Sequence, residues 1–476
     1  MSGQAAEGQA AGGQAADGQA TGRQTADGRT AGGQATGGQT AGGQTAGRQA
    51  AGRQAAGGQT AGEATGPGLD GYRREVRAWL AANLDPRDDD APARLRGGDA
   101  ANLSPERVAQ QRDLQRRIYE GGYAGITWPA EFGGQGLTPA HEEVFAQESR
   151  GYVVADLGIA GLTTTRVCGP TILAHGTDEF RRTHIPRMLS GEEIWVQLFS
   201  EPGAGSDLAG VSTRATRTDA DDWVLNGSKV WTSGAYYADY GLCLARTDPT
   251  VPKHRGLTWF GVPLTSDGVT IRPIREINGS SEFCEEFFDD VVVSDANRIG
   301  AVGDGWTVAR TMMVFERLGG DPDEAPRHAG ARELAPDLVA LARRVGRQGD
   351  PVTRQLIARA HVIDVVKEQL DAYVAAQAES GTANPNLGSY SKLAAGTLNP
   401  VRASIGLEIA AAAGVAWHPQ DTEASTTALN YLNGRILAIA GGTNEMQRNG
   451  ISERILGLPR EPAHDLDRPF NELRHN

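Results

Sequence analysis

The sequence predicts an α+β protein with a helical N-terminal domain, a middle antiparallel β-domain and a C-terminal four-helix-bundle domain. Three observations lead to this fold class. Apolar residues recur at helical spacing from about residue 70 to residue 190, and again after residue 305. Between about residues 195 and 293, short β-branched and aromatic runs alternate with turn sequences. Upstream of residue 67, five-residue Gly/Gln/Ala units repeat almost without large apolar side chains, which indicates a disordered low-complexity tail.

These shifts in composition set the expected domain boundaries. We expect a repeat tail over 1–66, an N-terminal helical domain over 67–195, a β-domain over 196–300, a C-terminal helical domain over 301–460 and a poorly ordered tail over 461–476. Roughly 400 residues lie outside the repeat, enough for several packed layers.

Composition narrows the function classes. The chain has 476 residues and a formal net charge of −13 without a dense Lys/Arg block, which argues against nucleic acid or an anionic membrane as partner. Cys168, Cys243 and Cys284 are too widely spaced to indicate a disulfide framework or a metal site. A signal-peptide pattern and an 18-residue apolar run are both missing from the sequence. We therefore expect a cytoplasmic protein that acts on small molecules.

Helix signals in the N-terminal region are clearest at residues 104–121. Ser104 is a good N-cap residue and Pro105 suits the first helical position. The pair Thr138-Pro139 carries the same signal and predicts another helix. Further helices are expected from about Asp70, within 153–173 and over 178–189.

The middle region carries strand signals at 257–262 and 286–293. Residues 223–225 and 228–234 also resemble strands, and the Asn226-Gly227 pair between them predicts a hairpin turn. Its second arm would bring an indole and two hydroxyls back towards the start of the domain.

The C-terminal region returns to helical spacing. Val308, Met312 and Phe315 lie on one face of a predicted helix, and further helices are expected over 338–345 and around 357–376. The Ala/Leu-rich composition that follows is typical of helices packed closely in a bundle.

One loop has the composition of a ligand-binding turn. Residues 199–207 follow an apolar strand-like run, and Gly203, Ala204 and Gly205 leave little side chain between the backbone and a ligand. Backbone N–H groups and the Ser206 hydroxyl could therefore contact a phosphate or a flat ring. A lone motif of this kind is more often an ordinary turn.

The loop 199–207 followed by the segment 223–234 resembles the acyl-CoA dehydrogenase family, whose flavin lies on a small β-domain between helical domains. Segments 125–134 and 441–448 are further matches, so the resemblance extends over about residues 70–460. It implies FAD as cofactor, with α,β-dehydrogenation of an acyl thioester, either acyl-CoA or carrier-bound.

The resemblance also implies a set of site residues. The flavin would be lined by residues 197–206, with Ser200 near the pyrimidine edge, Ser206 near the pyrophosphate, Trp231 on the ring and Ser233 reaching N5. The full expected cofactor set is Gln197, Phe199, Ser200, Gly205, Ser206, Trp231, Thr232, Ser233, Thr443 and Glu445, and the expected substrate-binding set is Ser206, Arg317 and Gly441.

The reaction requires a base at the substrate α-carbon, an acceptor for the β-hydrogen and polarisation of the thioester carbonyl. Many family members carry the base glutamate in a Tyr-Glu pair, but the equivalent positions here are Ala440 and Gly441. The isovaleryl and long-chain types place it on the first helix after the β-domain, where this chain has Glu316 above Met312 and Met313. The resemblance thus implies that Glu316 removes the α-proton and that flavin N5 accepts the β-hydride. The Gly441 N–H remains able to polarise the carbonyl.

Several alternatives stay open. The chain could be a largely inactive partner subunit of a heteromeric acyl-CoA dehydrogenase, or an oxygen-using flavoprotein of the same fold, such as an acyl-CoA oxidase or flavin monooxygenase. A Ser-x-x-Lys hydrolase site at 389–392 is disfavoured because it lies inside a predicted helix without companion motifs.

The ending of the chain, around 441–448, resembles actinobacterial members that act on steroid side chains or other bulky acyl groups, some of them as mixed-subunit tetramers. We therefore expect a role in lipid metabolism, as in fatty acid or steroid side-chain oxidation. A homo- or hetero-oligomer is expected, with electron-transfer flavoprotein as a candidate electron acceptor.

Overall fold

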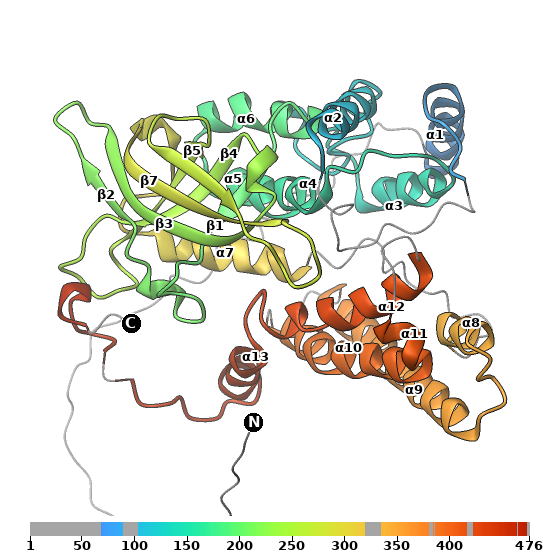
Figure 1. The fold of residues 1–476 in the computed structure, drawn as a ribbon. Coiled ribbons are helices and arrows are strands. Elements are labelled where there is room, and N and C mark those ends of the chain that lie inside the picture. Colours follow the sequence, from blue (N-terminus) through green and yellow to red (C-terminus); the bar gives the residue numbers. More distant parts are fainter. Residues whose placement is uncertain are drawn as a thin grey trace, which may run out of the picture. The chain divides into compact units, whose positions relative to one another are not determined.

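The computed structural model describes residues 68–88, 103–318, 335–379, 384, 386–416, 422–463 and 465–473. The repeat over 1–66, expected to be a disordered tail, lies outside the described residues. Within the described part, helices precede and follow a β-sheet along the chain, which confirms the predicted fold class (Figure 1). No helix of this part is long and apolar enough to cross a membrane.

The N-terminal helices begin where the sequence carries capping signals. Ser104 is the N-cap of α2, its Oγ accepts the N–H of Arg107 at 3.3 Å, and Pro105 takes the first position. Thr138 precedes α3, but its hydroxyl bonds Nδ1 of His141 at 2.8 Å and caps no backbone N–H. The α-helices of this part are α1 (Leu69–Asn83), α2 (Pro105–Glu120), α3 (Pro139–Glu148), α4 (Gly158–Thr163), α5 (Gly169–His175) and α6 (Asp178–Ser190).

The middle region forms one sheet in the order β6-β7-β3-β2-β4-β5-β8, with β1 added on β4. Most pairs are antiparallel as expected, but β1 runs parallel to β4, with Trp195 opposite Tyr240. Trp195, Leu242 and Phe260 are fully buried and belong to the apolar core of the sheet and its neighbours. The strands are β1 (Trp195–Leu198), β2 (Arg214–Arg217), β3 (Trp223–Ser233), β4 (Tyr240–Arg246), β5 (Leu257–Pro263), β6 (Val269–Pro273), β7 (Phe283–Val293) and β8 (Arg298–Ile299).

The Asn226-Gly227 pair is not the hairpin turn that the sequence predicts. β3 runs through it without a break, with a bulge where its register to β7 shifts. A Cβ at Gly227 would lie 2.5 Å from Oγ1 of Thr213, so glycine here allows two segments to approach closely. The turn that joins β2 to β3 lies instead at 218–222, where the Thr218 N–H donates to the Asp222 carbonyl at 2.8 Å.

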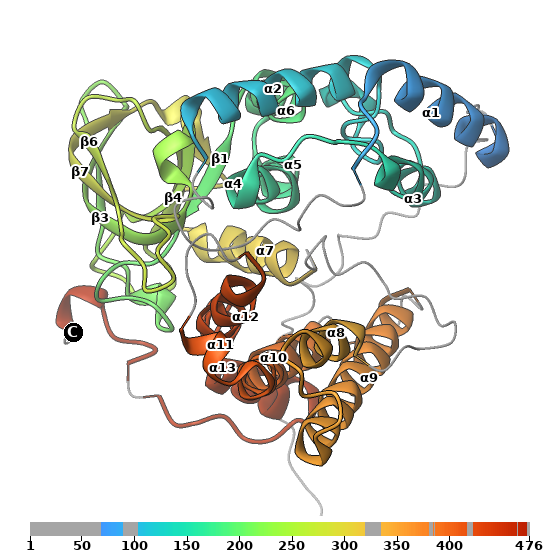
Figure 2. The ribbon, with the colours of Figure 1, turned by 45° about the vertical axis from the view of Figure 1, so that its right-hand side comes forward.

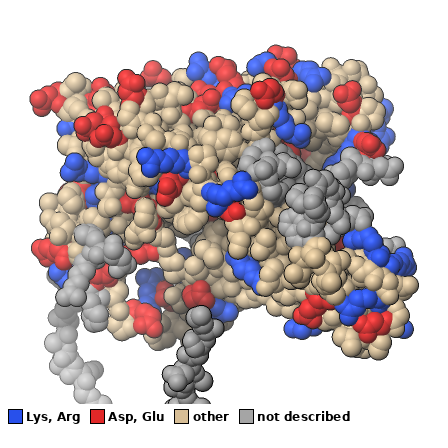
Figure 3. Space-filling view, in the orientation of Figure 1, with Lys and Arg blue, Asp and Glu red and all other residues tan. Residues whose placement is uncertain are grey.

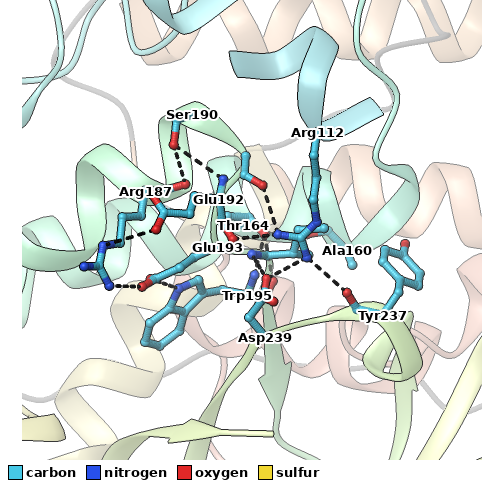
Figure 4. Close-up of polar contacts among 12 residues, drawn as sticks. Arg112, Ala160, Thr164, Arg187, Ser190, Glu192, Glu193, Trp195, Tyr237 and Asp239 are labelled. Carbon is cyan, nitrogen blue, oxygen red and sulfur yellow. Dashed lines mark hydrogen bonds and ion pairs between the residues drawn. The ribbon is translucent and has the colours of Figure 1, made fainter. Parts of the chain in front are cut away.

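A polar network fixes the start of β1 against the helices (Figure 4). Arg112 on α2 donates from Nη2 to Oδ2 of Asp239 at 2.7 Å, and the same oxygen accepts the Ile194 N–H at 2.7 Å. Thr164 accepts the Trp195 N–H at 2.7 Å and donates to the Trp195 carbonyl at 3.0 Å. Because β1 leads directly into the loop 199–207, these bonds also set where that loop begins.

Helix α7 (Gly305–Leu318) follows the sheet and contacts α5, β5 and α10 (Figure 2). Its residues Val308 and Met312 are buried, as their spacing predicts. A separate apolar core, which includes Leu338, Ile357 and Ile409, packs the first three C-terminal helices against one another, and three further described helices follow them. These helices are α8 (Pro336–Arg344), α9 (Pro351–Glu379), α10 (Gly388–Ala410), α11 (Ala412–Val415), α12 (Thr422–Asn433) and α13 (Asn444–Gly450).

The expectation of poor order after residue 460 is wrong for residues 465–473. This segment ends in a short 3-10 helix, η10 (Phe470–Glu472), and lies against the β-domain (Figure 1). The Phe470 N–H donates to the Val251 carbonyl at 2.9 Å, and the Asn471 N–H donates to the Pro249 carbonyl at 2.9 Å. The buried Phe470 ring is the apolar anchor, and one aromatic in a charged stretch is a weak signal in sequence.

On the face that Figure 3 shows, basic and acidic side chains are interspersed. Many charged side chains of the described residues are paired; for example, Arg402 donates from Nε to Oδ1 of Asp364 at 2.6 Å. A mixed surface of this kind offers no single-sign field on that face to steer a polyanion.

Candidate active site

The loop 199–207 closes on itself through its backbone. The Glu201 N–H donates to the Ala204 carbonyl at 3.0 Å, and the Ala204 N–H donates back to Glu201 at 3.0 Å. This tight turn directs Gly205 and Ser206 outwards, and both are exposed. A Cβ at Gly205 would meet no atom within 4 Å, so the space beside this glycine is open to a ligand.

A buried ion pair supports the loop from inside. Glu201 Oε1 accepts from Nζ of Lys229 on β3 at 2.8 Å, and both side chains are almost fully buried. Lys229 also donates to the Phe199 carbonyl at 3.1 Å, while the Ser212 and Thr213 N–H groups donate to the carboxylate at 2.6 and 2.9 Å. Burial alone would raise the pKa of Glu201, but Lys229 and these donors outweigh it and lower the pKa. The Glu201 carboxylate therefore stays ionised, and its bond to Lys229 holds the loop to β3.

The end of β3 runs beside the loop and splits its side chains between two faces. The Val230 N–H donates to the Ser200 carbonyl at 3.0 Å. A bulge then places Trp231 at φ +68°, and the residue is 59% exposed. The next hydroxyl, on Thr232, points into the sheet and donates to Oε2 of Glu286 at 2.9 Å. Of the two, only Trp231 presents its side chain outwards, and Thr232 retains only its backbone for an outward contact.

A cavity of about 310 Å³ opens beside Trp231. Its walls come from the end of β3, the connection between β6 and β7, the end of α12 and the 3-10 helix η8 (Ile436–Ala438). Asn278 joins the two sides by donating from Nδ2 to Oδ1 of Asn433 at 2.9 Å. The lining residues are Trp231, Ile274, Arg275, Glu276, Ile277, Asn278, Phe283, Leu432, Asn433 and Ile436. Apolar walls with a few polar groups are typical of a site for a planar aromatic ligand.

Gln197 on β1 has a buried side-chain oxygen, Oε1, to which no described residue donates a hydrogen bond. A buried amide oxygen without a donor is costly, and a ligand with an N–H group would satisfy it. The described residues thus fit a flavin in three respects: the open space beside Gly205, the apolar slot at Trp231 and the unpartnered oxygen of Gln197.

Glu316 on α7 lies beside Gly441. A Cβ at Gly441 would stand 3.5 Å from Glu316 Oε1 and 3.1 Å from Lys392 Cε. Gly441 has φ +66°, a conformation that favours glycine, and its carbonyl accepts from Nε2 of Gln447 at 3.1 Å. Lys392 donates from Nζ to the Leu437 carbonyl. By the resemblance, residues 316 and 441 are the two positions that can carry the base within the family. Their side-chain positions therefore lie next to each other.

The remaining expected site residues are placed as follows. Phe199 is half-buried, with its ring 5.0 Å from that of Trp259, and Ser233 pairs with Phe283 of β7. Thr443 caps α13 by accepting the Met446 N–H at 3.3 Å. Glu445 is exposed and contacts Arg448 at 3.5 Å. Arg317 lies on α7, and its side chain is outside the described part of the structure.

Sequence reasoning missed most of the cavity wall. Leu432 and Ile436 follow no motif, and only their position before the matched segment 441–448 could have drawn attention to them. In the sequence, Lys392 belongs only to a disfavoured hydrolase pattern, whereas the structure places it beside Gly441 and Glu316. Gln447 is 2% exposed and donates to the carbonyls of Gly441 and Gly442. These contacts join segments far apart in the chain, so spacing could not reveal them.

The sequence matches three family models that together span most of the chain. They are the acyl-CoA dehydrogenase N-terminal domain over residues 71–192, the middle domain over residues 197–291 and the C-terminal domain over residues 303–456.

Two mycobacterial proteins and a solved structure are similar to this chain. "Acyl-CoA dehydrogenase IpdE1" of Mycobacterium tuberculosis is 38% identical over 395 residues, which are 83% of this chain and 98% of that protein. "Acyl-CoA dehydrogenase FadE34" of the same organism is also 38% identical, over 83% of this chain but 53% of its own length. The solved "Tcur3481-Tcur3483 steroid ACAD" is 28% identical with a TM-score of 0.66, covering 83% of this chain and 98% of that one.

The solved ChsE4-ChsE5 complex from Mycobacterium tuberculosis is 27% identical with a TM-score of 0.61, covering 84% of this chain and 99% of that one. The three domain matches, the nearly full-length similarity to the first of these relatives and the fold all agree with one another. The chain belongs to the acyl-CoA dehydrogenase family of flavoproteins, whose members are FAD-dependent oxidoreductases acting on CH–CH groups.

Proposed function

We propose that this protein catalyses FAD-dependent α,β-dehydrogenation of an acyl thioester, with Glu316 as the base that removes the α-proton. The observation that carries the proposal is the distance of 3.5 Å between Glu316 Oε1 and the Cβ position of Gly441. By the resemblance, residue 441 is where many family members carry the base. A carboxylate that reaches the same point from α7 can approach the same α-carbon.

The surroundings of Glu316 suit a base. Met312, one turn earlier on α7, is fully buried, and Met313 is partly buried against the same core. Apolar neighbours of this kind are typical of carboxylates that act as general bases.

The chain offers separate groups for the other requirements of the reaction. The Gly441 N–H would polarise the thioester carbonyl, and Ser206 and Arg317 would contact the substrate. Gln197 from β1 and Ser200 and Ser206 from the loop would bind the flavin, and Trp231 would pack on its ring. When bound, FAD supplies the two-electron acceptor that takes the β-hydrogen as a hydride at N5.

The flavin spectrum of the purified full-length protein tests the cofactor. We expect non-covalent FAD with its visible absorption bands. Anaerobic mixing with straight-chain, branched and steroid side-chain acyl-CoA esters should bleach these bands with at least one of the esters. A colourless protein that acquires no flavin absorbance on refolding with excess FAD would remove the proposal.

A second subunit is the next part of the proposal. Two similar structures are named as two-protein assemblies, Tcur3481-Tcur3483 and ChsE4-ChsE5. We therefore propose that this chain forms a homo- or hetero-oligomer, and light scattering on the flavin-loaded protein distinguishes these from a monomer. Because Gly441 lacks a carboxylate, a partly inactive partner subunit is the second candidate function. That candidate would be favoured if the wild type is as inactive as the Glu316→Gln variant.

A two-electron oxidation also needs a terminal acceptor. We propose electron-transfer flavoprotein, and oxygen is the alternative for an oxidase of the same fold. Substrate turnover in air with stoichiometric hydrogen peroxide would favour the oxidase, whereas turnover that requires added electron-transfer flavoprotein would favour the dehydrogenase.

A further inference from the structure

Residues 465–473, here called the C-terminal strap, contact the β-domain next to the loop 199–207. Besides its two backbone hydrogen bonds to Val251 and Pro249, the strap forms an isolated bridge between Pro469 and Pro252. The strap thus packs against the segment 249–253. Lys253 of this segment also contacts Asp207 in the loop that the proposed function assigns to the flavin.

Phe470 of the strap covers Arg246 on β4. The Arg246 guanidinium carbon lies 3.8 Å from the centre of the Phe470 ring, and the two residues are 2% and 6% exposed, respectively. Arg246 donates to the carbonyls of Ala209 at 2.6 Å and Val211 at 3.1 Å. Burial lowers the pKa of Arg246 to about 10, so the guanidinium stays charged at neutral pH. Phe470 therefore keeps water from the group that holds the chain just after the loop.

Lys253 joins the strap to the loop directly. Its Nζ donates to Oδ2 of Asp465 in the strap at 2.6 Å and to Oδ2 of Asp207 at 3.0 Å. Burial lowers the pKa of Lys253, but the two carboxylates outweigh it and raise the pKa, so the ammonium stays charged. Asp207 follows Ser206, and its carbonyl accepts the Gly210 N–H at 2.8 Å. One ammonium thus fixes the residue at which the exposed loop ends.

We propose that the C-terminal strap is part of the cofactor site, in which Asp465, Lys253 and Phe470 act as positioning residues for the loop 203–207. This inference rests on the proposed function, because it assumes that the loop holds the FAD pyrophosphate. A loop that is already ordered loses less conformational entropy when it binds a ligand, so the strap increases affinity without touching the ligand. Because the interaction runs through Asp207 and the chain at 209–211, it acts on FAD binding and leaves the chemistry at Glu316 unchanged.

Titration of apo full-length variants with FAD tests this role. Phe470→Ala and Asp465→Asn should raise the FAD dissociation constant by about tenfold or more, the change expected when one positioning interaction is lost. Asp465→Glu keeps the charge and should restore most of the affinity. Arg468→Ala is the matched control, since the Arg468 side chain contacts Glu472 within the strap and should leave the dissociation constant unchanged.

The thermal midpoint of the apo protein separates positioning from general stability. Asp465→Asn should leave the apo midpoint close to that of wild type while FAD affinity falls, and this variant keeps the test valid even where Phe470→Ala folds poorly. Unchanged FAD affinity in both Asp465→Asn and Lys253→Met would overturn the inference, as would an equal loss in Arg468→Ala. A wild-type protein that binds no FAD would instead overturn the proposed function on which it rests.

Discussion

Glu316 Oε1 lies 3.5 Å from the point where a Cβ at Gly441 would stand, although the two residues are on α7 and on the segment before α13. The Glu316 carboxylate thus lies beside the space that a side chain at residue 441 would occupy. Gly441 keeps this arrangement open, because a larger residue there would have to adopt φ +66° and approach Lys392.

Glu316→Gln should retain FAD and bind acyl thioester, while flavin reduction by substrate slows by at least about 10²-fold. Glutamine keeps the size and hydrogen-bonding reach of glutamate but cannot accept the proton. Anaerobic stopped-flow mixing of the FAD-loaded variant with an acyl-CoA ester that reduces the wild type measures the rate. Reduction at the wild-type rate would exclude Glu316 as base, and loss of flavin would indicate a structural carboxylate.

Moving the base to residue 441 tests the proximity of the two positions. In Glu316→Gln, adding Gly441→Glu should restore little activity, because a Cβ there meets Lys392 Cε at 3.1 Å and the backbone has a positive φ. Adding Lys392→Ala as well removes that contact and should raise the reduction rate above that of the double variant. Glu316→Gln with Lys392→Ala alone is the control. Equal rates in the triple variant and this control would argue against a shared α-carbon position.

Lys229→Met should lower the free energy of unfolding by about 3–5 kcal/mol, since it leaves the buried Glu201 carboxylate without its cation. Urea unfolding followed by tryptophan fluorescence measures the loss. The double variant Lys229→Met/Glu201→Gln removes both charges and should recover a substantial part of it. If Glu201→Gln destabilises the Lys229→Met variant as much as it destabilises the wild type, the two side chains are not coupled.

Stability should fall with rising pH because of Glu286. Burial raises its pKa, and the Thr232 hydrogen bond and Lys229 lower it, leaving the pKa raised from 4.5 to about 7. Among the described residues, none bonds its Oε1, which agrees with a carboxyl that stays protonated. Below pH 4.5 the group is neutral in both the folded and unfolded states; as pH rises through about 7 the folded protein must ionise a buried group.

Wild type should therefore lose stability relative to Glu286→Gln between about pH 4.5 and about pH 7, by on the order of 3 kcal/mol at most, with no further loss above that window. Urea unfolding of both proteins across this range measures the difference. Parallel stability curves for the two proteins would show that Glu286 does not titrate in the window.

The local elements could be predicted because their signals act over a few residues. Ser104-Pro105 begins α2 as the sequence predicts, since an N-cap and its partner N–H lie within one turn. The burial of Val308 and Met312 likewise follows from helical period alone. The tight turn around Glu201 and Ala204 was expected from its small residues.

Other features depended on neighbours that no local pattern shows. Asn226-Gly227 has the strongest hairpin signal in the chain, yet it lies in a bulge of β3, because pairing with β7 continues on both sides. The order of the strap has no local signal in the sequence, because the site that anchors it, around Arg246, is more than 200 residues upstream.

Local patterns in the sequence are enough to predict the order of helices, sheet and helices, the turn that the proposed function assigns to FAD, and Glu316 instead of Gly441 as the candidate base. Only in the folded protein do Glu316 and Gly441 meet, with Lys392 beside them, and only there does Thr232 turn away from Trp231. The physical reason is that capping, period and turn chemistry act between neighbours in the chain. The meeting of distant side chains depends instead on how whole elements pack, which is set by burial summed over the entire core.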